Sequence, residues 1–320
     1  MASQGNQQPK IGNIIRTILL ASLVIILPGL EWSLFGWLYL FLPLLALYTL
    51  SRYGGFVGQR LLGIAGVVAL VAYLLLHNFE FFIFSVAMLV AGSVLFFSAQ
   101  RHDPPALSGI KGSLALAGSW VAIFAMLSIG SEVSAYGQFL RSLDAGITEA
   151  LNYYRQNNDI SAETLVMLES TLHWMKVYIP RVMPSLLGSF ILGLIWFTMV
   201  LGNILIPKAG GDAPWESYQL WQLPEKIIWT AIGAGLCVLM PIQIVRMIGI
   251  NVLVLLSMIY CFQGMSIAVF FMNKWKVPLL LRSFFYVMVI FQSFGTILLL
   301  ILGIGDIWFD FRKLKQKEIN

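Results

Sequence analysis

Long apolar runs recur through this chain of 320 residues and constrain its fold more than any other feature. A membrane-spanning helix needs about 20 consecutive, mostly apolar residues, because the hydrocarbon core of a bilayer is about 30 Å thick. Runs of this length and composition predict an all-α, polytopic transmembrane helical bundle of eight or nine membrane segments. We count nine runs, near residues 13–30, 32–50, 56–76, 79–99, 112–130, 182–206, 226–245, 247–272 and 278–304.

The composition excludes a soluble globular protein. Hydrophobic residues make up 59% of the chain and charged residues only 11%, whereas a soluble domain carries about 25% charged residues. The aromatic content of 13% fits a membrane protein, because Trp and Tyr collect at the two membrane–water interfaces. The net charge of +5 is small for this length, and membrane topology and anionic lipid explain it better than nucleic-acid binding does.

Neither a cleaved leader nor a metal or cofactor site is predicted. Residues 1–10 are polar, and the first apolar run ends at Pro28-Gly29 without a small-residue cleavage site, so we expect the first helix to be retained. The only cysteines, Cys237 and Cys261, lie within apolar runs and resemble small hydrophobic residues. The sequence has no phosphate-binding glycine loop, His-Glu-x-x-His or Cys-x-x-Cys motif. We therefore expect no enzyme active site of the soluble type.

Residues 131–181 interrupt the series of apolar runs. They carry charges of both signs, with apolar residues at helical spacing, and Ser161 is a suitable N-cap for a second helix. This pattern predicts a helical hairpin outside the bilayer or on its surface. The hairpin is a connector that covers the bundle, or it has a partner-docking or lid role. Its two apolar stripes are Phe139, Leu143, Ile147 and Leu151, and Leu165, Leu168, Leu172 and Met175.

The predicted organisation has four parts. Residues 1–130 form N-terminal transmembrane hairpins of about five segments, and residues 131–181 form the extra-membrane hairpin. Residues 182–311 form a C-terminal transmembrane bundle of about four segments, with room for one re-entrant segment. Residues 312–320 are a basic tail.

Lys and Arg predict the topology, because short cytoplasmic loops retain them. On this rule the N-terminus is cytoplasmic and the 131–181 hairpin lies outside. Nine crossings, however, would put the basic tail outside, against the rule. Either one run is re-entrant, with 226–272 and its breaks at Pro241 and Arg246 as the first suspect, or the tail is an exception. The residues that predict the cytoplasmic side are Lys10, Arg16, Arg52, Arg60, Arg101, Lys111, Lys208, Lys274 and Lys276.

Four polar or small residues within the C-terminal runs are candidates for solute binding or gating. Arg246 and Asn251 follow Pro241, and a discontinuous helix with such groups can bind an anionic or polar solute. The alternative is a short loop whose arginine reaches the headgroups. Gln263 and Gly264 lie within a run, where the amide can hydrogen-bond a neighbouring helix and the glycine lets that helix approach. Solute contact is the alternative for this pair.

Two further clusters are candidates for an interface or a partner contact. Pro224 suits the first turn of a helix and Glu225 favours the positive end of its dipole, so this cluster is a membrane-entry cap with Trp221 as an anchor, or a gate or partner contact. Near the C-terminus, Asp306 and Asp310 are four residues apart and would share one face of a continuing helix. Such a pair can do acid–base chemistry or bind a cation, but Trp308, Arg312 and Lys313 beside it favour a charged exit from the membrane.

In their order and spacing, these features resemble the YybS-like family of predicted bacterial membrane proteins. The resemblance covers roughly residues 160–315, and the first half agrees only in hydropathy. The family is grouped by remote similarity with the substrate-binding S components of energy-coupling-factor transporters. That grouping implies a compact helical bundle that binds a small solute and docks on a partner module. The features are Pro180–Pro184, Trp221–Glu225, Asn251, Gln263-Gly264 and Asp306–Lys313.

We therefore expect an integral protein of the bacterial cytoplasmic (inner) membrane. The first hypothesis is transport-related, S-component-like binding of a small solute, without an ATPase of its own because the chain has no ATP-binding motif. The alternative is a non-catalytic scaffold or accessory subunit that binds other membrane proteins. A third hypothesis, an enzyme acting on lipid, would need Asp306 and Asp310. The expected partners are the bilayer, a small solute, and other membrane proteins or a separate ATPase module, but no nucleic acid.

Overall fold

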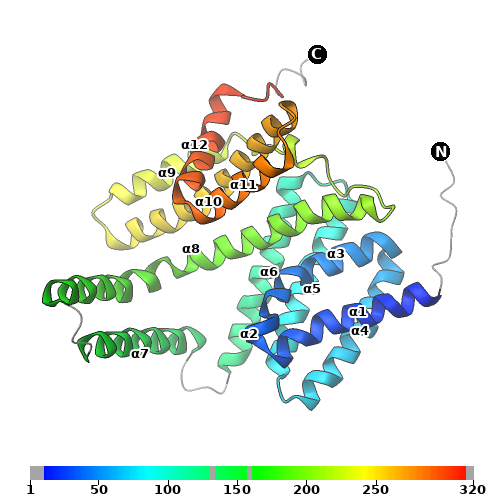
Figure 1. Ribbon diagram of the computed structural model, residues 1–320, viewed down its shortest axis with the longest axis horizontal. Coiled ribbons are helices and arrows are strands. Elements are labelled where there is room, and N and C mark those ends of the chain that lie inside the picture. The colour runs from blue at the N-terminus through cyan, green and yellow to red at the C-terminus, as the bar shows by residue number, and fades with distance from the viewer. Residues whose placement is uncertain (1–10, 130–133, 157–160, 315–320) are drawn as a thin grey trace. The chain divides into compact units, whose positions relative to one another are not determined.

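The computed structural model describes residues 11–129, 134–156 and 161–314, and every regular element within these ranges is a helix (Figure 1). The predicted all-α class is confirmed. The chain forms two compact units. The first contains Met1–Trp120, Ile191–Pro224 and Ile259–Asn320, and the second contains Val121–Phe190 and Glu225–Met258.

The N-terminal half consists of apolar helices joined by short turns. A six-residue 3-10 segment, Gly36–Phe41, continues α2 into α3, so that Trp32–Tyr53 counts as one candidate span. The helices are α1 (Ile11–Leu30), α2 (Trp32–Phe35), α3 (Leu42–Tyr53), α4 (Gly55–Leu75), α5 (Phe79–Gln100) and α6 (Pro105–Ser128).

Close backbone contacts hold these helices together in the first unit. A Cβ atom on Gly92 of α5 would lie 2.1 Å from the carbonyl oxygen of Pro43 in α3. Tyr73 of α4 is fully buried, lies over Gly29 of α1, and donates its hydroxyl to the carbonyl of Ile25 at 2.7 Å. Small residues thus let α3 and α5 approach closely, as in other membrane bundles. The hydrogen bond of the buried Tyr73 joins α4 to α1.

In the second unit, α7 (Ala135–Gln156) and the first part of α8 (Ala162–Lys208) form an antiparallel hairpin (Figure 1). An ion pair of 2.7 Å joins Arg155 to Glu169, and another joins Asp144 to Lys176. The Ser161 hydroxyl accepts the Thr164 N–H at 3.2 Å, so the predicted N-cap is confirmed. The residues between the two helices lie outside the described ranges.

The C-terminal half contains α9 (Ile227–Leu239), α10 (Gln243–Lys274), α11 (Leu279–Phe291) and α12 (Ser293–Phe309). Within the described residues, seven helices are long and apolar enough to cross a membrane, or eight if the bent pair α11 and α12 is one span. The seventh predicted run, 226–245, contains one short helix of 13 residues, α9, before the chain breaks at Met240–Ile242. At 1.5 Å per residue α9 is about 20 Å long, which is shorter than the bilayer core.

Helix α8 has 47 residues and combines two of the predicted parts. Its length is about 70 Å, more than twice the bilayer core. The first part carries Glu163, Glu169 and Lys176, whereas no charged residue lies between Arg181 and Lys208. The second helix of the predicted hairpin and the next apolar segment are therefore one continuous helix.

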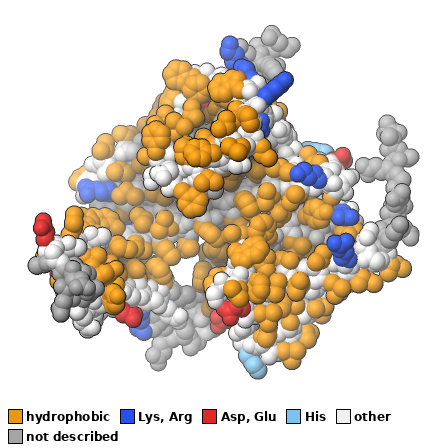
Figure 2. All heavy atoms as spheres, viewed as in Figure 1, with side chains coloured by type: hydrophobic (Ala, Val, Ile, Leu, Met, Phe, Trp, Pro, Cys, Tyr) orange, Lys and Arg blue, Asp and Glu red, His pale blue; other side chains and the backbone are white. Residues whose placement is uncertain are grey.

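The outer surface is apolar over much of the face seen in Figure 2, with charged side chains in small groups. Large hydrophobic side chains such as Leu75, Phe56 and Leu279 are more than two-thirds exposed. Such a surface is unfavourable in water but suits the hydrocarbon of a bilayer.

Candidate functional site

The two polar residues predicted beside the break at Pro241 lie together in the second unit. Asn251 accepts the Ser185 N–H at 3.0 Å and donates to the carbonyl of Arg181 at 2.9 Å. These two groups of α8 are hydrogen-bond partners in a regular helix, because they are four residues apart. Arg246 is exposed and donates to the carbonyl of Met240 at 3.4 Å. Both residues line a cavity of about 490 Å³.

Gln263 and Gly264 lie elsewhere, in the first unit. The Gln263 side chain is buried and donates to Asp306 of α12 at 2.8 Å. A Cβ atom on Gly264 would lie 1.9 Å from the carbonyl oxygen of Leu299, and one on Gly303 would lie 2.0 Å from that of Tyr260. These contacts agree with the packing interpretation of the pair. The four candidates therefore do not line one cavity.

Asp306 and Arg312 form a buried ion pair with an oxygen–nitrogen distance of 2.9 Å. The Arg312 side chain is fully buried, and its second terminal nitrogen donates to the Ser266 hydroxyl at 2.8 Å. The same nitrogen donates to the carbonyls of Gln219 and Trp221 at 2.8 and 3.0 Å. This network ties the C-terminal segment to α10 and to the loop before α9.

The prediction that Asp306 and Asp310 share a face of one continuing helix is wrong. Helix α12 ends at Phe309, and Asp310 adopts a left-handed conformation with φ of 38°. The chain turns there, so that the Phe311 N–H donates to Asp306 at 3.0 Å and the Leu314 N–H donates to Asp310 at 3.2 Å. Each carboxylate holds a different part of the turn.

The remaining interface candidates are spread over the loop before α9 and the end of α12. The Trp221 indole is half-buried and donates to the carbonyl of Glu216 at 2.9 Å. Pro224 lies before α9 and not in its first turn as predicted, because Glu225 and Lys226 form a separate turn and the helix begins at Ile227. Glu225 is exposed, as is Trp308 on α12.

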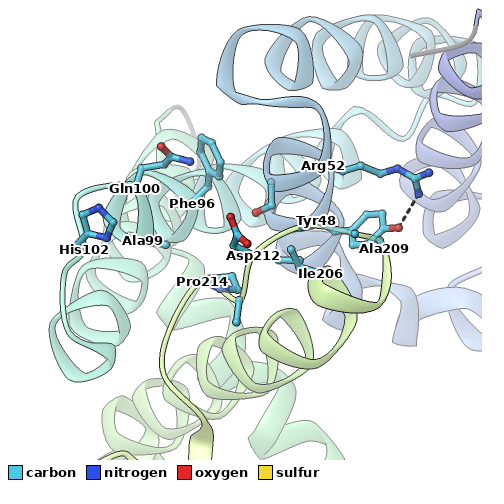
Figure 3. A pocket seen from close by; sticks show the side chains of 14 residues that line it. Tyr48, Arg52, Phe96, Ala99, Gln100, His102, Ile206, Ala209, Asp212 and Pro214 are labelled. Atoms are coloured by element: carbon cyan, nitrogen blue, oxygen red, sulfur yellow. Dashed lines mark hydrogen bonds between the residues drawn. The ribbon is translucent and has the colours of Figure 1, made fainter. Parts of the chain in front are cut away.

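A larger polar cavity, of about 780 Å³, lies in the first unit (Figure 3). It is open on one side, and the polar side chains around it come from three parts of the chain. Tyr48 and Arg52 come from α3, Gln100 and His102 from the end of α5, and Asp212 from the loop after α8. Arg52 donates to the Tyr48 hydroxyl at 2.9 Å, which fixes both at the edge of the cavity.

The loop after α8 forms one wall of this cavity and is anchored through its backbone. The Asn203 side chain accepts the Trp215 N–H at 3.0 Å and donates to the carbonyl of Glu216 at 2.9 Å. The buried Trp215 indole donates to the Ser108 hydroxyl at 2.9 Å. Gly210 has φ of 86°, which favours glycine at this turn. The wall is thus held in one conformation.

A charged pair supports the helix ends beside the cavity. Asp103 pairs with Lys111 at 2.5 Å and accepts from the hydroxyl of Ser98. The Lys111 ammonium, followed by the Ser98 hydroxyl, holds the pKa of the Asp103 carboxyl below its usual range. Asp103 is therefore charged at neutral pH and fixes the turn from α5 into α6.

The cavity offers both signs of charge to a ligand. Arg52 and Asp212 are exposed and take part in no ion pair within the described ranges. With Gln100 and His102 they supply hydrogen-bond donors and acceptors for a small polar or zwitterionic molecule. Among the described residues, no group of three or more His, Cys, Asp or Glu side chains could hold a metal ion.

Sequence reasoning did not identify this cavity. Arg52 is used above only to predict the membrane topology. Gln100, His102 and Asp212 belong to no recognisable motif, so no function is predicted for them. One signal was available in the sequence, because basic residues mark both helix ends: Arg52 lies in the last turn of α3, and Arg101 follows Gln100 at the end of α5. The topology predicts which helix ends lie on the same side of the membrane. It does not predict which of these helices pack against each other, so the cavity could not be located from the sequence.

A family model described as "Predicted membrane protein (DUF2232)" matches residues 17–307. No curated protein and no solved structure matches the chain. The matched range includes most of α1 and α12 and all of the helices between them. It agrees with the membrane class and names no substrate or activity.

Proposed function

The chain belongs to the DUF2232 family of predicted membrane proteins, and from this premise we propose that it binds a small polar solute in a transport-related role. The proposed site is the cavity between α3, the end of α5 and the loop after α8. The protein would reside in the bacterial cytoplasmic membrane and would have no ATPase of its own. The resemblance to S components supports this proposal, since they bind a solute and rely on a partner for energy.

The observation that carries the proposal is the mixed polar lining of the cavity in an otherwise apolar chain. A polar group in a membrane protein is costly unless it faces a partner or water. Here Arg52 and Asp212 both line one space of about 780 Å³, with the Arg52 guanidinium turned toward Tyr48 at its edge (Figure 3). That volume lies within the range of small-molecule sites, about 300–1,000 Å³.

The proposed site opens on the cytoplasmic side. Arg52 and Lys208 flank it, and Arg101 follows the end of α5, so the local excess of basic residues favours the cytoplasm. A solute bound there would be taken from, or released to, the cell interior. Energy would come from an ion gradient or a separate ATPase module.

The test is affinity purification of the full chain from native membranes in mild detergent, with mass spectrometry of co-purifying small molecules and proteins. We expect one polar compound with the wild type and with an Arg60→Gln control, whose arginine lies outside the cavity. The compound should be lost from an Arg52→Gln/Asp212→Asn double variant. Equal recovery from the double variant would contradict binding at this cavity.

The same experiment tests the alternative. If no compound is enriched but the same membrane proteins arrive each time with wild type and double variant, the chain is a scaffold or accessory subunit. An ATPase module recovered with the solute would add the energy source that the chain itself lacks.

A further inference from the structure

A second cavity, made only of residues of the second unit, carries an inference independent of the solute proposal. It has a volume of about 490 Å³, and its lining includes two arginines but no Asp or Glu. Arg181 comes from α8 and Arg246 from the first turns of α10. Two arginines from two helices therefore line one small space.

Neither arginine is neutralised within the described part of the chain. Arg181 lies over the ring of Tyr178 at 5.5 Å, and Arg246 donates to the carbonyl of Met240. Neither takes part in an ion pair within the described ranges. Most of their ten N–H donors, about five for each guanidinium, remain available to an anionic ligand.

The helices that carry the arginines are fixed against each other. Asn251 of α10 bonds to the backbone of α8 at Arg181 and Ser185. On the other side, a Cβ atom on Gly249 would lie 2.7 Å from the carbonyl oxygen of Ala234 in α9, so α9 and α10 are also in close contact. The cavity is thus built on a rigid frame, as a binding site requires.

A long uncharged stretch follows each of the two arginines. The next charged residue after Arg181 on α8 is Lys208, and the next after Arg246 on α10 is Lys274. Each arginine therefore marks the start of a stretch long enough to cross a bilayer, at the depth of the headgroups.

The rim of the cavity is apolar and aromatic. Leu239, Ile242 and Ile244, next to the cavity residues Pro241 and Gln243, are 79%, 58% and 70% exposed. On α8, Trp174 stacks on Tyr178 with ring centroids 4.7 Å apart, a pair of the kind found at membrane interfaces. A ligand here would meet cations in the cavity and apolar surface beside it.

We propose that this cavity binds a phosphate group between Arg181 and Arg246, and that the group belongs to the headgroup of an anionic phospholipid. Arginine forks match phosphate oxygens bidentately. The exposed apolar side chains on the rim fit the acyl chains, which free phosphate lacks. The bound lipid would bridge α8 and α10 at one membrane surface.

The test is native mass spectrometry and thermal unfolding of the purified full chain in detergent with added phosphatidylglycerol, phosphatidylcholine or inorganic phosphate. We expect retention and stabilisation by phosphatidylglycerol over phosphatidylcholine. The apparent affinity should fall at least about tenfold in Arg181→Gln/Arg246→Gln, because charge-assisted hydrogen bonds are lost. Arg141→Gln, on the exposed face of α7, is the matched control and should bind as the wild type does.

The single variant Arg246→Gln keeps the test informative if the double variant is poorly folded, since Arg246 is exposed. Stabilisation of the wild type, but not of Arg246→Gln, by inorganic phosphate alone would identify free phosphate as the source of the group and overturn the lipid assignment. Equal phosphatidylglycerol binding by wild type, double variant and control would overturn the site altogether.

Discussion

At the scale of single residues, the buried pair Asp306–Arg312 is costly to disturb. Removing one partner of a buried ion pair costs about 3–5 kcal/mol, because a charge remains without compensation. Asp306→Leu should therefore destabilise the protein strongly, whereas Asp306→Leu/Arg312→Met should lose less than the single variant. Denaturation in detergent measures the difference. If the double variant loses as much stability as the single variants Asp306→Leu and Arg312→Met lose when their losses are added, the two side chains do not act as a pair.

A second prediction at this scale concerns Asp103 and acid stability. Lys111 lowers the pKa of Asp103 in the folded state. The pair therefore stabilises the folded protein at pH values above the ordinary carboxyl pKa of about 3.9. This stabilisation is lost as the pH falls through the lowered pKa that Asp103 has in the folded state. Lys111→Met should be less stable than wild type near neutral pH, and the gap should close below about pH 4. Thermal unfolding over this pH range measures the gap, and a constant gap would contradict the assignment.

The residue scale is also where sequence reasoning was weakest. The sequence gives the positions of Asp306 and Arg312, but the helix end at Phe309 depends on the left-handed turn at Asp310. That turn brings Arg312 back toward Ser266, Gln219 and Trp221, which are distant in sequence. A periodic pattern continued through Asp310 therefore predicted a shared face that does not exist.

At the scale of elements, Gly264 decides how closely α12 approaches α10. A methyl group there would lie 1.9 Å from the Leu299 carbonyl oxygen. Gly264→Ala should cost at least about 1–3 kcal/mol through overpacking. The control is Gly63→Ala on α4, which has open space around it and should be neutral or slightly stabilising. Thermal unfolding of both variants compares them directly. Equal stability of Gly264→Ala and Gly63→Ala would show that α12 does not pack closely against Gly264.

The loop after α8 provides the next prediction. Asn203 bonds to two backbone groups of this loop. Asn203→Ala leaves the Trp215 N–H without its side-chain partner, whereas the Glu216 carbonyl keeps the Trp221 indole, so we expect a cost of about 1 kcal/mol. Hydrogen exchange at the Trp215 amide should accelerate. Ser119→Ala is the control, because that hydroxyl bonds only to the carbonyl of Ala115 in its own helix. Unchanged exchange at Trp215 would mean that the wall of the cavity is held in another way.

Helices were the part of the fold that hydropathy predicted well. The apolar runs fixed the existence of α1, α4 and α5, whose bounds lie within a few residues of those expected. The hairpin stripes also predicted α7 and the start of α8. The break near Pro241 was visible, but the short length of α9 was not, because apolar residues continue through the turn at Met240–Ile242.

At the scale of the whole molecule, two properties define the protein. It belongs to a family of membrane proteins, with seven or eight candidate spans within the described residues. Among the cavities within the described residues, two differ clearly in chemistry. One has both signs of charge and fits a polar solute, while the other has arginines without acids beside exposed apolar residues. Neither cavity follows from a motif, because each joins residues from separate helices.

The most direct test of solute binding is the labelling of Ala213→Cys in a Cys237→Ala/Cys261→Ala background by a membrane-impermeant maleimide. Ala213 is exposed and lines the polar cavity, whereas Ser217→Cys, in the same loop but outside the cavity lining, is the control. We predict that both cysteines react in inside-out vesicles, and that a low-molecular-mass extract of the host cells protects only residue 213. This protection should disappear with Asp212→Asn. Reaction only from the opposite face, or no protection of residue 213, would contradict a cytoplasmic solute site.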